Sequence, residues 1–504
     1  MNVLYLPTSS LVPFWFLTFL TFSTFFSLST YTVANELYGA GPNNAQLRQD
    51  LVLLSQNNRI NLPTTVWPIP WRMISNELQS IKHKNLSPGE QLAFKRIQAL
   101  QPEQYSASVK LQASSQPALL TQYGFSEIED ESLALSLGTN QQHWSSAITI
   151  TQTASPLDNK STRPDDSYLT GHLDNWNIGV GALDRWWGPG WQSSLILSNN
   201  ARPVPSVFLS RTSNQPFNTS WLNWLGNWHA ITFLGELESE RTIPNARLWG
   251  ARVTLQPTHH WEIGLSRTAM WAGDGRPSGF DTFWDLLLGQ DNYDDPTLKA
   301  TKEPGNQLGG FDFLYKRNIK ESQLRLYAQW IGEDEAGYLP SRSMALFGSS
   351  LTQFWQQAFP TTVYLEIQDT VADVLKPERL YNTVYQHGIY RTGYRTYGRV
   401  MGASTDNDTR TATWGLFAQL DQKQSVQASF SYHLFNRDGL PGGNTVAQSP
   451  LEAMSSFAQY RIRNKNHLLT FFGQVFDKLP ENLLQVDDKL IAGLSYQYVI
   501  APNL

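Results

Sequence analysis

The sequence has no cysteine and few charged residues, and each shortage excludes a class of protein. Without cysteine the chain has neither disulfide bonds nor thiolate metal sites. Charged residues make up 16% of the chain, against a usual share of about 25%. The net charge of −5 provides no basic surface for nucleic acid. After residue 28, no stretch approaches the ~20 apolar residues that a membrane-spanning helix needs.

Aromatic residues are abundant instead, with 18 Trp, 20 Tyr and 25 Phe, although the mean hydropathy is negative at −0.36. A helical membrane protein of this length would be strongly apolar overall. A transmembrane β-barrel need not be, because every second strand residue faces a polar interior. A large secreted all-β carbohydrate enzyme would have similar values, so composition alone leaves both possibilities open.

The N-terminus reads as a targeting segment. An apolar run covers residues 11–28, and Thr32-Val33-Ala34 offers a small-residue cleavage site before Asn35. We therefore expect residues 1–34 to be a signal peptide. The usual basic start is missing, because the first Lys or Arg is Arg48. An uncleaved signal anchor is the alternative.

Residues 35–103 have helical periodicity. Leu47, Leu51 and Leu54 recur at near-helical spacing, and Ser87-Pro88-Gly89-Glu90 matches a capping box with proline at the first helical position. This region is predicted to be a small α-helical bundle of three helices, on the periplasmic side in front of the next domain.

From Tyr105 onward the period becomes two, as in β-strands; for example, residues 324, 326, 328 and 330 are apolar and alternate with Arg325, Tyr327 and Gln329. Short turns are predicted at 256–260, 317–321, 421–424 and 463–466, and long loops at 272–307, 333–359, 402–408, 437–452 and 478–487. Alternating short and long connections are typical of outer-membrane barrels. Residues 104–504 are therefore predicted to form an all-β transmembrane barrel of about 18 antiparallel strands, with strand positions in 185–228 ambiguous.

We find no zinc-binding, phosphate-loop or nucleophile-elbow motif, so the sequence predicts no enzyme, cofactor or metal ion. The predicted outer loops are rich in aromatic residues and arginine. Aromatic faces stack on sugar rings, and planar guanidinium groups bind carboxylates in a bidentate way. The candidate polysaccharide-binding residues are Trp271, Asp274, Arg276, Trp284, Tyr394, Arg395, Tyr397 and Arg399. An aromatic girdle or simple loop packing would explain the same residues.

One further motif supports a family resemblance. The run Arg185-Trp186-Trp187-Gly188-Pro189-Gly190-Trp191 resembles the capsule-assembly Wzi family of outer-membrane proteins. The resemblance continues through residues 194–203, 235–241, 264–268 and 273–277, and includes residues 65–71. The glycines and proline of the run suit a tight turn, so we expect Arg185, Trp186, Trp187, Gly188, Pro189 and Gly190 to be architectural.

The resemblance implies an eighteen-stranded barrel in the bacterial outer membrane with a helical bundle at its periplasmic end. Its outer loops would act as a lectin that holds capsular or extracellular polysaccharide at the cell surface. The expected partners are that polysaccharide, outer-membrane lipid and the barrel-assembly machinery. A channel for saccharides or for polysaccharide export is the alternative, and a membrane-embedded enzyme has no motif to support it.

Overall fold

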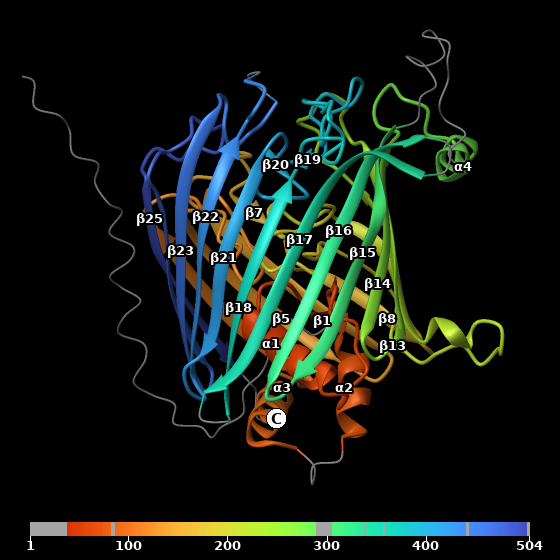
Figure 1. Cartoon of the computed structure of the whole chain (residues 1–504), viewed down its shortest axis with the longest axis vertical. Helices are drawn as coiled ribbons and strands as arrows, with labels where there is room; N and C mark the ends of the chain where they lie inside the picture. The colour runs from red at the N-terminus through yellow and green to blue at the C-terminus, as the bar shows by residue number, and fades with distance from the viewer. Residues whose placement is uncertain are drawn as a thin grey trace, which may run out of the picture.

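A computed structural model describes residues 38–81, 86–288, 305–336, 339–355, 358–439 and 443–500. Most of this chain forms one closed antiparallel barrel, in which β25 (Leu490–Ile500) pairs with β4 (Tyr105–Ser114) to close the ring (Figure 1). The predicted signal peptide lies outside the described residues. No helix in the described residues is both long and apolar enough to cross a membrane.

The barrel has eighteen strands, as predicted, and a two-residue strand, β7 (Thr162–Arg163), pairs with the end of β6. Besides β4 and β25, the barrel strands are β5 Glu131–Asn140, β6 Trp144–Thr153, β8 Tyr168–Leu173, β9 Trp176–Gly181, β11 Ser206–Arg211, β12 Asn227–Glu236, β13 Arg247–Thr258, β14 Trp261–Trp271, β15 Gly305–Ile319, β16 Ser322–Ala336, β17 Leu339–Trp355, β18 Phe359–Asp369, β21 Arg410–Gln419, β22 Gln424–Phe435, β23 Leu451–Asn464 and β24 His467–Phe476.

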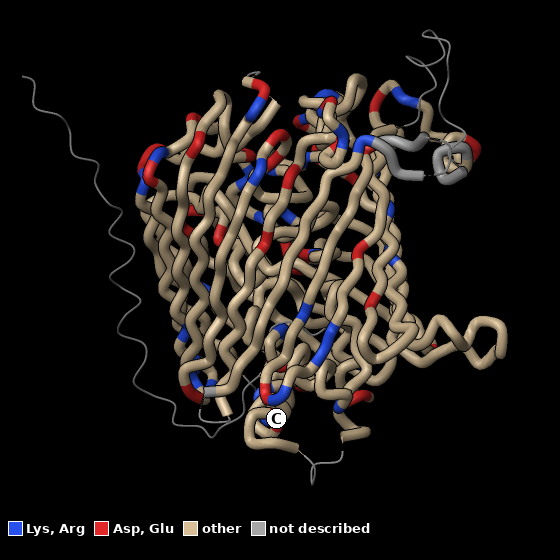
Figure 2. The backbone as a smooth tube through the Cα atoms, in the orientation of Figure 1, with Lys and Arg blue, Asp and Glu red and all other residues tan. Residues whose placement is uncertain are grey.

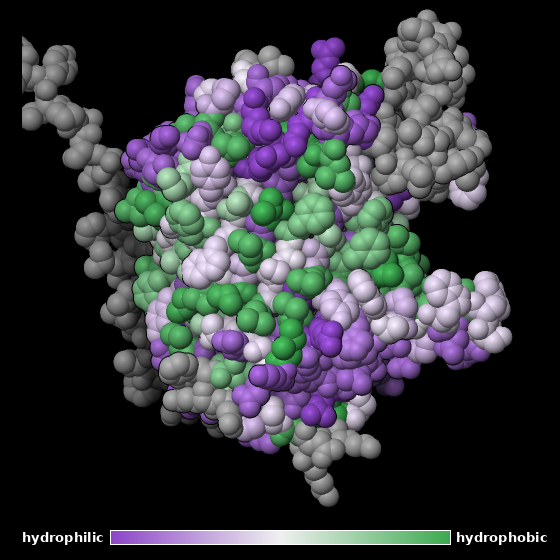
Figure 3. Space-filling view, viewed as in Figure 1, coloured by the Kyte–Doolittle hydropathy of each residue, from purple (hydrophilic) through white to green (hydrophobic). Residues whose placement is uncertain are grey.

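The two faces of each strand differ as the alternation predicts. In β16, Leu326 is exposed on the outer wall, whereas Arg325 and Gln329 are buried on the inner face. On the face seen in Figure 3, apolar residues gather on the middle of the wall, below the polar loops. A soluble sandwich would bury its apolar row, so this outward-facing row identifies the wall as a lipid-facing surface.

The connections differ in length at the two ends of the barrel. The predicted short turns lie between β13 and β14, β15 and β16, β21 and β22, and β23 and β24. We call this the short-turn end and the opposite one the long-loop end. One predicted loop was wrong: most of 333–359 is strand, because β16 and β17 pair as far as Ala336 and Leu339. In the ambiguous 185–228 segment only β11 and the first residues of β12 belong to the barrel.

The helices are α1 (Ala45–Gln56), α2 (Trp71–Gln79) and α3 (Pro88–Ala99), and the Ser87–Glu90 capping box is present as predicted. They lie at the short-turn end (Figure 1). Sequence analysis placed them in front of the barrel, but α1 lies against its inner face. The Gln56 side chain donates to the carbonyl oxygens of Arg317 and Leu324, and Thr362 of β18 donates to Gln49.

Much of the remaining interior is filled by two long segments, residues 182–205 and 370–409, and residues 118–125 also reach it. In the half nearer the helices, Trp186 and Trp191 pack with α1, α2 and α3 in one buried cluster. In the other half, Leu195 and Ile196 of the first segment pack with Tyr385 and neighbouring residues of the second. The lumen therefore holds two packed clusters instead of a wide water-filled bore.

Candidate functional site

The Arg185–Trp191 run crosses the lumen and is built into its core. Trp186 and Trp187 form β10, which pairs with β2 (Val66–Trp67) from the helical region. The side chains of Trp186 and Trp187 are at most 1% exposed. A Cβ at Gly188 would lie 2.8 Å from the Gln329 amide oxygen, so a larger residue would displace the side chain that binds this run. These contacts place the run inside the core, and its architectural role stays a prediction.

Arg48 of α1 joins the helices to this run. Its guanidinium donates to the carbonyl oxygens of Gly190 at 2.7 Å and Pro189 at 2.6 Å. It also lies 4.3 Å from the ring centres of both Tyr123 and Trp191. A buried arginine that gains two carbonyl acceptors and two aromatic faces is held firmly, so helix and run form one plug.

The barrel wall grips the same run from the other side. Gln329 of β16 donates to the Trp187 carbonyl at 2.7 Å and accepts from the Leu195 amide at 2.8 Å. Glu366 of β18 accepts from the backbone amide of Gln192 at 3.0 Å and from the Tyr327 hydroxyl at 2.8 Å. The plug is therefore attached by polar side chains of the inner wall, which the alternation of the sequence supplies.

The second group of predicted binding residues lies in the 370–409 segment, in a short hairpin of β19 (Arg395–Thr396) and β20 (Arg399–Val400). This hairpin is a separate two-stranded sheet and not part of the barrel. Tyr394 is fully buried and stacks on Tyr385. Arg395 donates to both carboxylate oxygens of Asp406, at 2.9 and 2.6 Å.

Arg399 is also buried, and it donates to the Ala118 carbonyl at 2.6 Å. Tyr397 is half-buried, with the Arg202 guanidinium 4.3 Å from its ring centre. Tyr394, Arg395 and Arg399 therefore hold the segment in place. Of this group, only Tyr397 presents part of its side chain to solvent.

The first predicted group divides between wall and loop. Trp271 shares the outward face of β14 with Trp261 and Leu265, and α4 (Phe280–Leu288) covers it, with Phe283 at 5.0 Å between ring centres. Trp271 is 4% exposed, but Trp284 on the same helix is 50% exposed. Because every second residue of β14 faces outward, Trp271 lies on the outer wall under α4 and not in the mouth of the barrel.

Asp274 and Arg276 follow β14 in the loop that leads to α4. Asp274 is exposed and accepts from the Asn245 side chain at 3.3 Å. Arg276 is half-buried beside the Tyr390 hydroxyl, which itself donates to the Ala272 carbonyl at 2.9 Å. The structure thus brings this loop into contact with the 370–409 segment at Tyr390, whereas Trp284 stacks on Phe280 of α4.

A site that the sequence analysis missed lies at the long-loop end of β18, β21 and β22. Asp369, the last residue of β18, accepts hydrogen bonds from three arginines. The Asp369 carboxylate lies 2.7 Å from Arg379, 2.7 Å from Arg410 and 3.3 Å from Arg437. We call these three arginines with Asp369 the rim arginine cluster.

The rim arginine cluster carries more positive than negative charge, since three guanidinium groups share one carboxylate. The side chains of Arg379, Arg410 and Arg437 are 23%, 40% and 20% exposed, but that of Asp369 is only 6% exposed. The exposed Tyr381 ring lies beside it, 5.9 Å from the Arg437 guanidinium. Charged residues gather at this end of the barrel (Figure 2). The cluster can therefore accept a further carboxylate next to an aromatic face.

Antiparallel register is what assembles this cluster. Asp369 pairs directly with Arg410 across β18 and β21, and Arg437 follows the end of the next strand, β22. In the sequence, the trace of this cluster is an arginine or aspartate at the same end of three strands that become neighbours. The sequence did not show that β18 and β21 are neighbours, because a forty-residue connection, 370–409, separates them.

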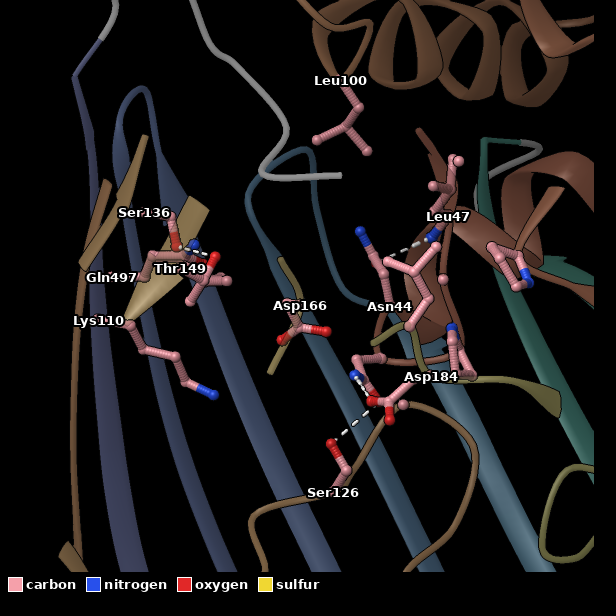
Figure 4. Close-up of a pocket in the computed structure, with 18 of the residues that line it drawn as sticks. Asn44, Leu47, Leu100, Lys110, Ser126, Ser136, Thr149, Asp166, Asp184 and Gln497 are labelled. Carbon is pink, nitrogen blue, oxygen red and sulfur yellow. Dashed lines mark hydrogen bonds between the residues drawn. The ribbon is translucent and has the colours of Figure 1, made fainter. Parts of the chain in front are cut away.

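A separate cavity of about 220 Å³ lies between the N-terminal segment and the wall formed by strands such as β4, β5 and β6 (Figure 4). Among its charged groups, Lys110 pairs with Glu127 at 2.8 Å, and Asp184 accepts from the Asn43 side chain at 2.7 Å. Ser136 and Thr149 share a hydrogen bond on its wall. We interpret this cavity as a hydrated gap beside the plug.

Comparisons with known proteins agree with this architecture. The model of the capsule assembly protein Wzi family matches residues 100–476. A Klebsiella pneumoniae protein, described as an uncharacterized 55.8 kDa protein in the cps region, is 30% identical over 416 residues, which is 79% of this chain and 81% of that protein.

Among solved structures, the chain resembles Wzi from Escherichia coli, described as an outer membrane protein involved in group 1 capsule assembly and a carbohydrate-binding β-barrel. The TM-score is 0.81 at 24% identity, covering 92% of this chain and all of that one. The likeness extends over barrel and plug together. On the family match and the Klebsiella relative, this chain belongs to the Wzi family of capsule assembly proteins.

Proposed function

We propose that this protein is an outer-membrane, lectin-like barrel that binds an acidic capsular polysaccharide and retains it at the cell surface. The observation that carries the proposal is the rim arginine cluster at the mouth of a barrel whose lumen is filled. Family membership and the cps location of the Klebsiella relative support it, as does the carbohydrate binding attributed to the Escherichia coli structure.

This proposal orients the barrel with its long loops outside and its helices in the periplasm, as is usual for such barrels. Residues 1–34 would be removed as a signal peptide, leaving Asn35 as the first mature residue. Insertion would require the barrel-assembly machinery, and outer-membrane lipid would surround the apolar wall.

The rim arginine cluster has more hydrogen-bond donors than its one carboxylate can accept from. Asp369 cannot satisfy three guanidinium groups in full, and their remaining N–H donors are held close together in fixed positions. A uronate carboxylate of a polysaccharide supplies the planar bidentate acceptor that arginine prefers. Tyr381 offers a ring on which the same sugar can stack. Weak contacts of this kind, repeated along a polymer, give strong retention.

The earlier candidates take different places in this proposal. Asp274, Arg276, Trp284 and Tyr397 keep some exposed surface and remain candidate contacts for the polymer. The other four, Trp271, Tyr394, Arg395 and Arg399, are buried, and we assign them to supporting the outer loops. We assign no catalytic step to any of these residues.

A saccharide channel is the competing function, and the filled lumen disfavours it. Purified protein in planar bilayers should show no large, stable conductance, since α1 and the two long segments occupy the bore. Steady porin-like conductance of the full chain would instead support transport.

The binding proposal is tested by Arg379→Ala combined with Arg437→Ala in a strain that lacks the native protein. We expect cell-bound polysaccharide to fall several-fold and released polysaccharide to rise, because interface residues of this type contribute about 1–2 kcal/mol each. Lys376→Ala is the matched control, since Lys376 is exposed on the same segment but pairs with Asp373 instead. Migration on gels with and without boiling verifies that each variant is folded. If the folded double variant retains polysaccharide like wild type, the rim arginine cluster is not the binding site.

A further inference from the structure

One connection at the short-turn end differs from the four predicted short turns there. Those turns span two to four residues between strands, whereas β11 and β12 are joined by residues 212–226. This segment, which we call the lateral loop, extends sideways from the barrel wall and not downward with the helices (Figure 1, yellow-green). Its direction is therefore along the plane of a surrounding membrane.

The composition of the lateral loop is unusual for an exposed segment. Residues 212–226 include no Lys, Arg, Asp or Glu, and the tube of the loop is accordingly tan in Figure 2. Trp221 is 71% exposed, and Trp224, which lies within a short 3₁₀ turn (Asn223–Leu225), is 69% exposed. Two large indole rings thus face outward without any charge to favour water.

The base of the lateral loop is fixed by contacts within the chain. The Arg211 guanidinium lies 3.8 Å from the Trp228 ring centre and donates to the carbonyl oxygens of Ser213, Gln215 and Trp228. The Phe217 ring stacks on the same Trp228 ring, with 4.5 Å between the ring centres.

The returning arm is fixed as well. Gly226 has φ +68°, and a Cβ there would lie 1.9 Å from the Gln256 carbonyl oxygen, so glycine is required for the loop to rejoin the wall. With both arms held, the exposed tryptophans project in a defined direction, and their exposure is not a product of a loose loop.

Other aromatic residues mark the same end of the barrel. Tyr105, Trp144 and Trp261, each at the start of a strand, are 43–44% exposed on the outer wall. Aromatic residues at strand ends form the girdle that sits at the level of lipid headgroups, where an amphipathic indole is most stable. The lateral loop extends this girdle outward from the wall. An aqueous protein partner would leave the lack of charge and the sideways direction unexplained.

We propose that the lateral loop is a lipid anchor, with Trp221 and Trp224 inserted at the headgroup boundary of the leaflet around the short-turn end. The inference rests on the proposed membrane location of the barrel. Its partner is the phospholipid surface itself. By holding one side of the wall at a fixed depth, the anchor would set the position and tilt of the plugged barrel.

Because the chain has no cysteine, single cysteine variants can carry one fluorescent label each. The labelled variants are Leu222→Cys in the lateral loop, Lys423→Cys in the exposed β21–β22 turn, and Leu365→Cys on the lipid-facing wall. The full chain is placed in phosphatidylethanolamine and phosphatidylglycerol vesicles with brominated acyl chains. We expect quenching at Leu222→Cys to be several-fold greater than at Lys423→Cys and to approach that at Leu365→Cys.

Quenching at Leu222→Cys no greater than at Lys423→Cys, with Leu365→Cys quenched, would overturn the anchor and leave the membrane location intact. If Leu365→Cys is also unquenched, the membrane location fails and the anchor with it. In the Leu222→Cys background, Trp221→Glu with Trp224→Glu should abolish quenching, while Trp221→Phe with Trp224→Phe should retain most of it. Equal quenching in the two double variants would also overturn the role of the tryptophans.

Discussion

Arginine is used in two different ways in the lumen and at the rim. In the lumen, Arg252 donates to both oxygens of Asp312, at 2.6 and 3.0 Å, and also to Ser266 and Thr65. Arg48 has two carbonyl partners and Arg395 a carboxylate partner, whereas Arg325 donates to the Thr64 hydroxyl. At the rim, three arginines share the single Asp369 and remain partly exposed.

The difference separates structure from binding more clearly than residue type does. A guanidinium with its own buried acceptors stabilises the plug, and its removal leaves an unpaired buried carboxylate. A guanidinium that shares an acceptor at the surface costs little to remove, but it is available to a ligand. Substitutions in the two regions should therefore affect different measurements, folding in one and polysaccharide retention in the other.

The largest expected effect is that of Arg395→Ala in the buried part of the 370–409 segment. The change leaves Asp406 buried without its bidentate partner, which typically costs about 3–5 kcal/mol. We expect a lower thermal unfolding midpoint in detergent and faster tryptic cleavage within residues 370–409. Arg391→Ala, an exposed position on the same segment, is the control and should behave like wild type. Unchanged stability of Arg395→Ala would remove the distinction between lumen and rim arginines.

The sequence was informative about the strands and less so about the loops that fold back into the lumen. Period-two alternation predicted the strands and their lipid and lumen faces, because each side chain's direction follows from strand geometry alone. The capping box at Ser87 is equally local. Arg395 and Tyr394 were assigned to sugar because the sequence cannot reveal which loops fold back into the lumen. That depends on distant partners such as Asp406 and the Leu195 carbonyl, which accepts from Tyr385.

Trp271 and the rim arginine cluster illustrate the same limit. Trp271 lies at the expected end of β14, but strand parity puts it on the outer wall, where α4 covers it. The cluster required the pairing of β18 with β21 across a long connection. Local pattern thus predicted the barrel, whereas exposure at the mouth needed the tertiary structure.

A second prediction concerns Asp408, a buried carboxyl of the 370–409 segment. Burial raises the pKa of Asp408 to about 7, and the nearby Asp438 and Asp406 carboxylates add to this, against a hydrogen bond from the Asn382 amide that lowers the pKa. An acid with a raised pKa in the folded state stabilises the fold when protonated. That contribution is complete below the ordinary value of 3.8 and is lost as pH rises through about 7.

Asp408→Asn should therefore stabilise the protein at pH 8, by an amount on the order of 4 kcal/mol at most. The gap between the variant and wild type should close as the pH falls toward 4. Thermal midpoints of both proteins across this range provide the measurement. If the thermal midpoints of the two proteins change with pH in the same way, Asp408 does not titrate between pH 4 and pH 8 and makes no contribution to the pH dependence of stability.

The smallest expected effect is that of Leu416→Ala on the outer wall. This variant compares a lipid-facing substitution with substitutions of the lumen and rim arginines. Leu416 shares the outward face of β21 with Trp414, which is 54% exposed. Its side chain faces lipid, so truncation leaves no cavity inside the protein and should cost less than about 1 kcal/mol. Barrel stability comes mainly from paired backbone groups, which the change does not touch. Polysaccharide retention and the pH profile should both match wild type. A marked loss of retention in folded Leu416→Ala would mean that capsule binding depends on the wall, and the functional separation of rim from barrel would then be wrong.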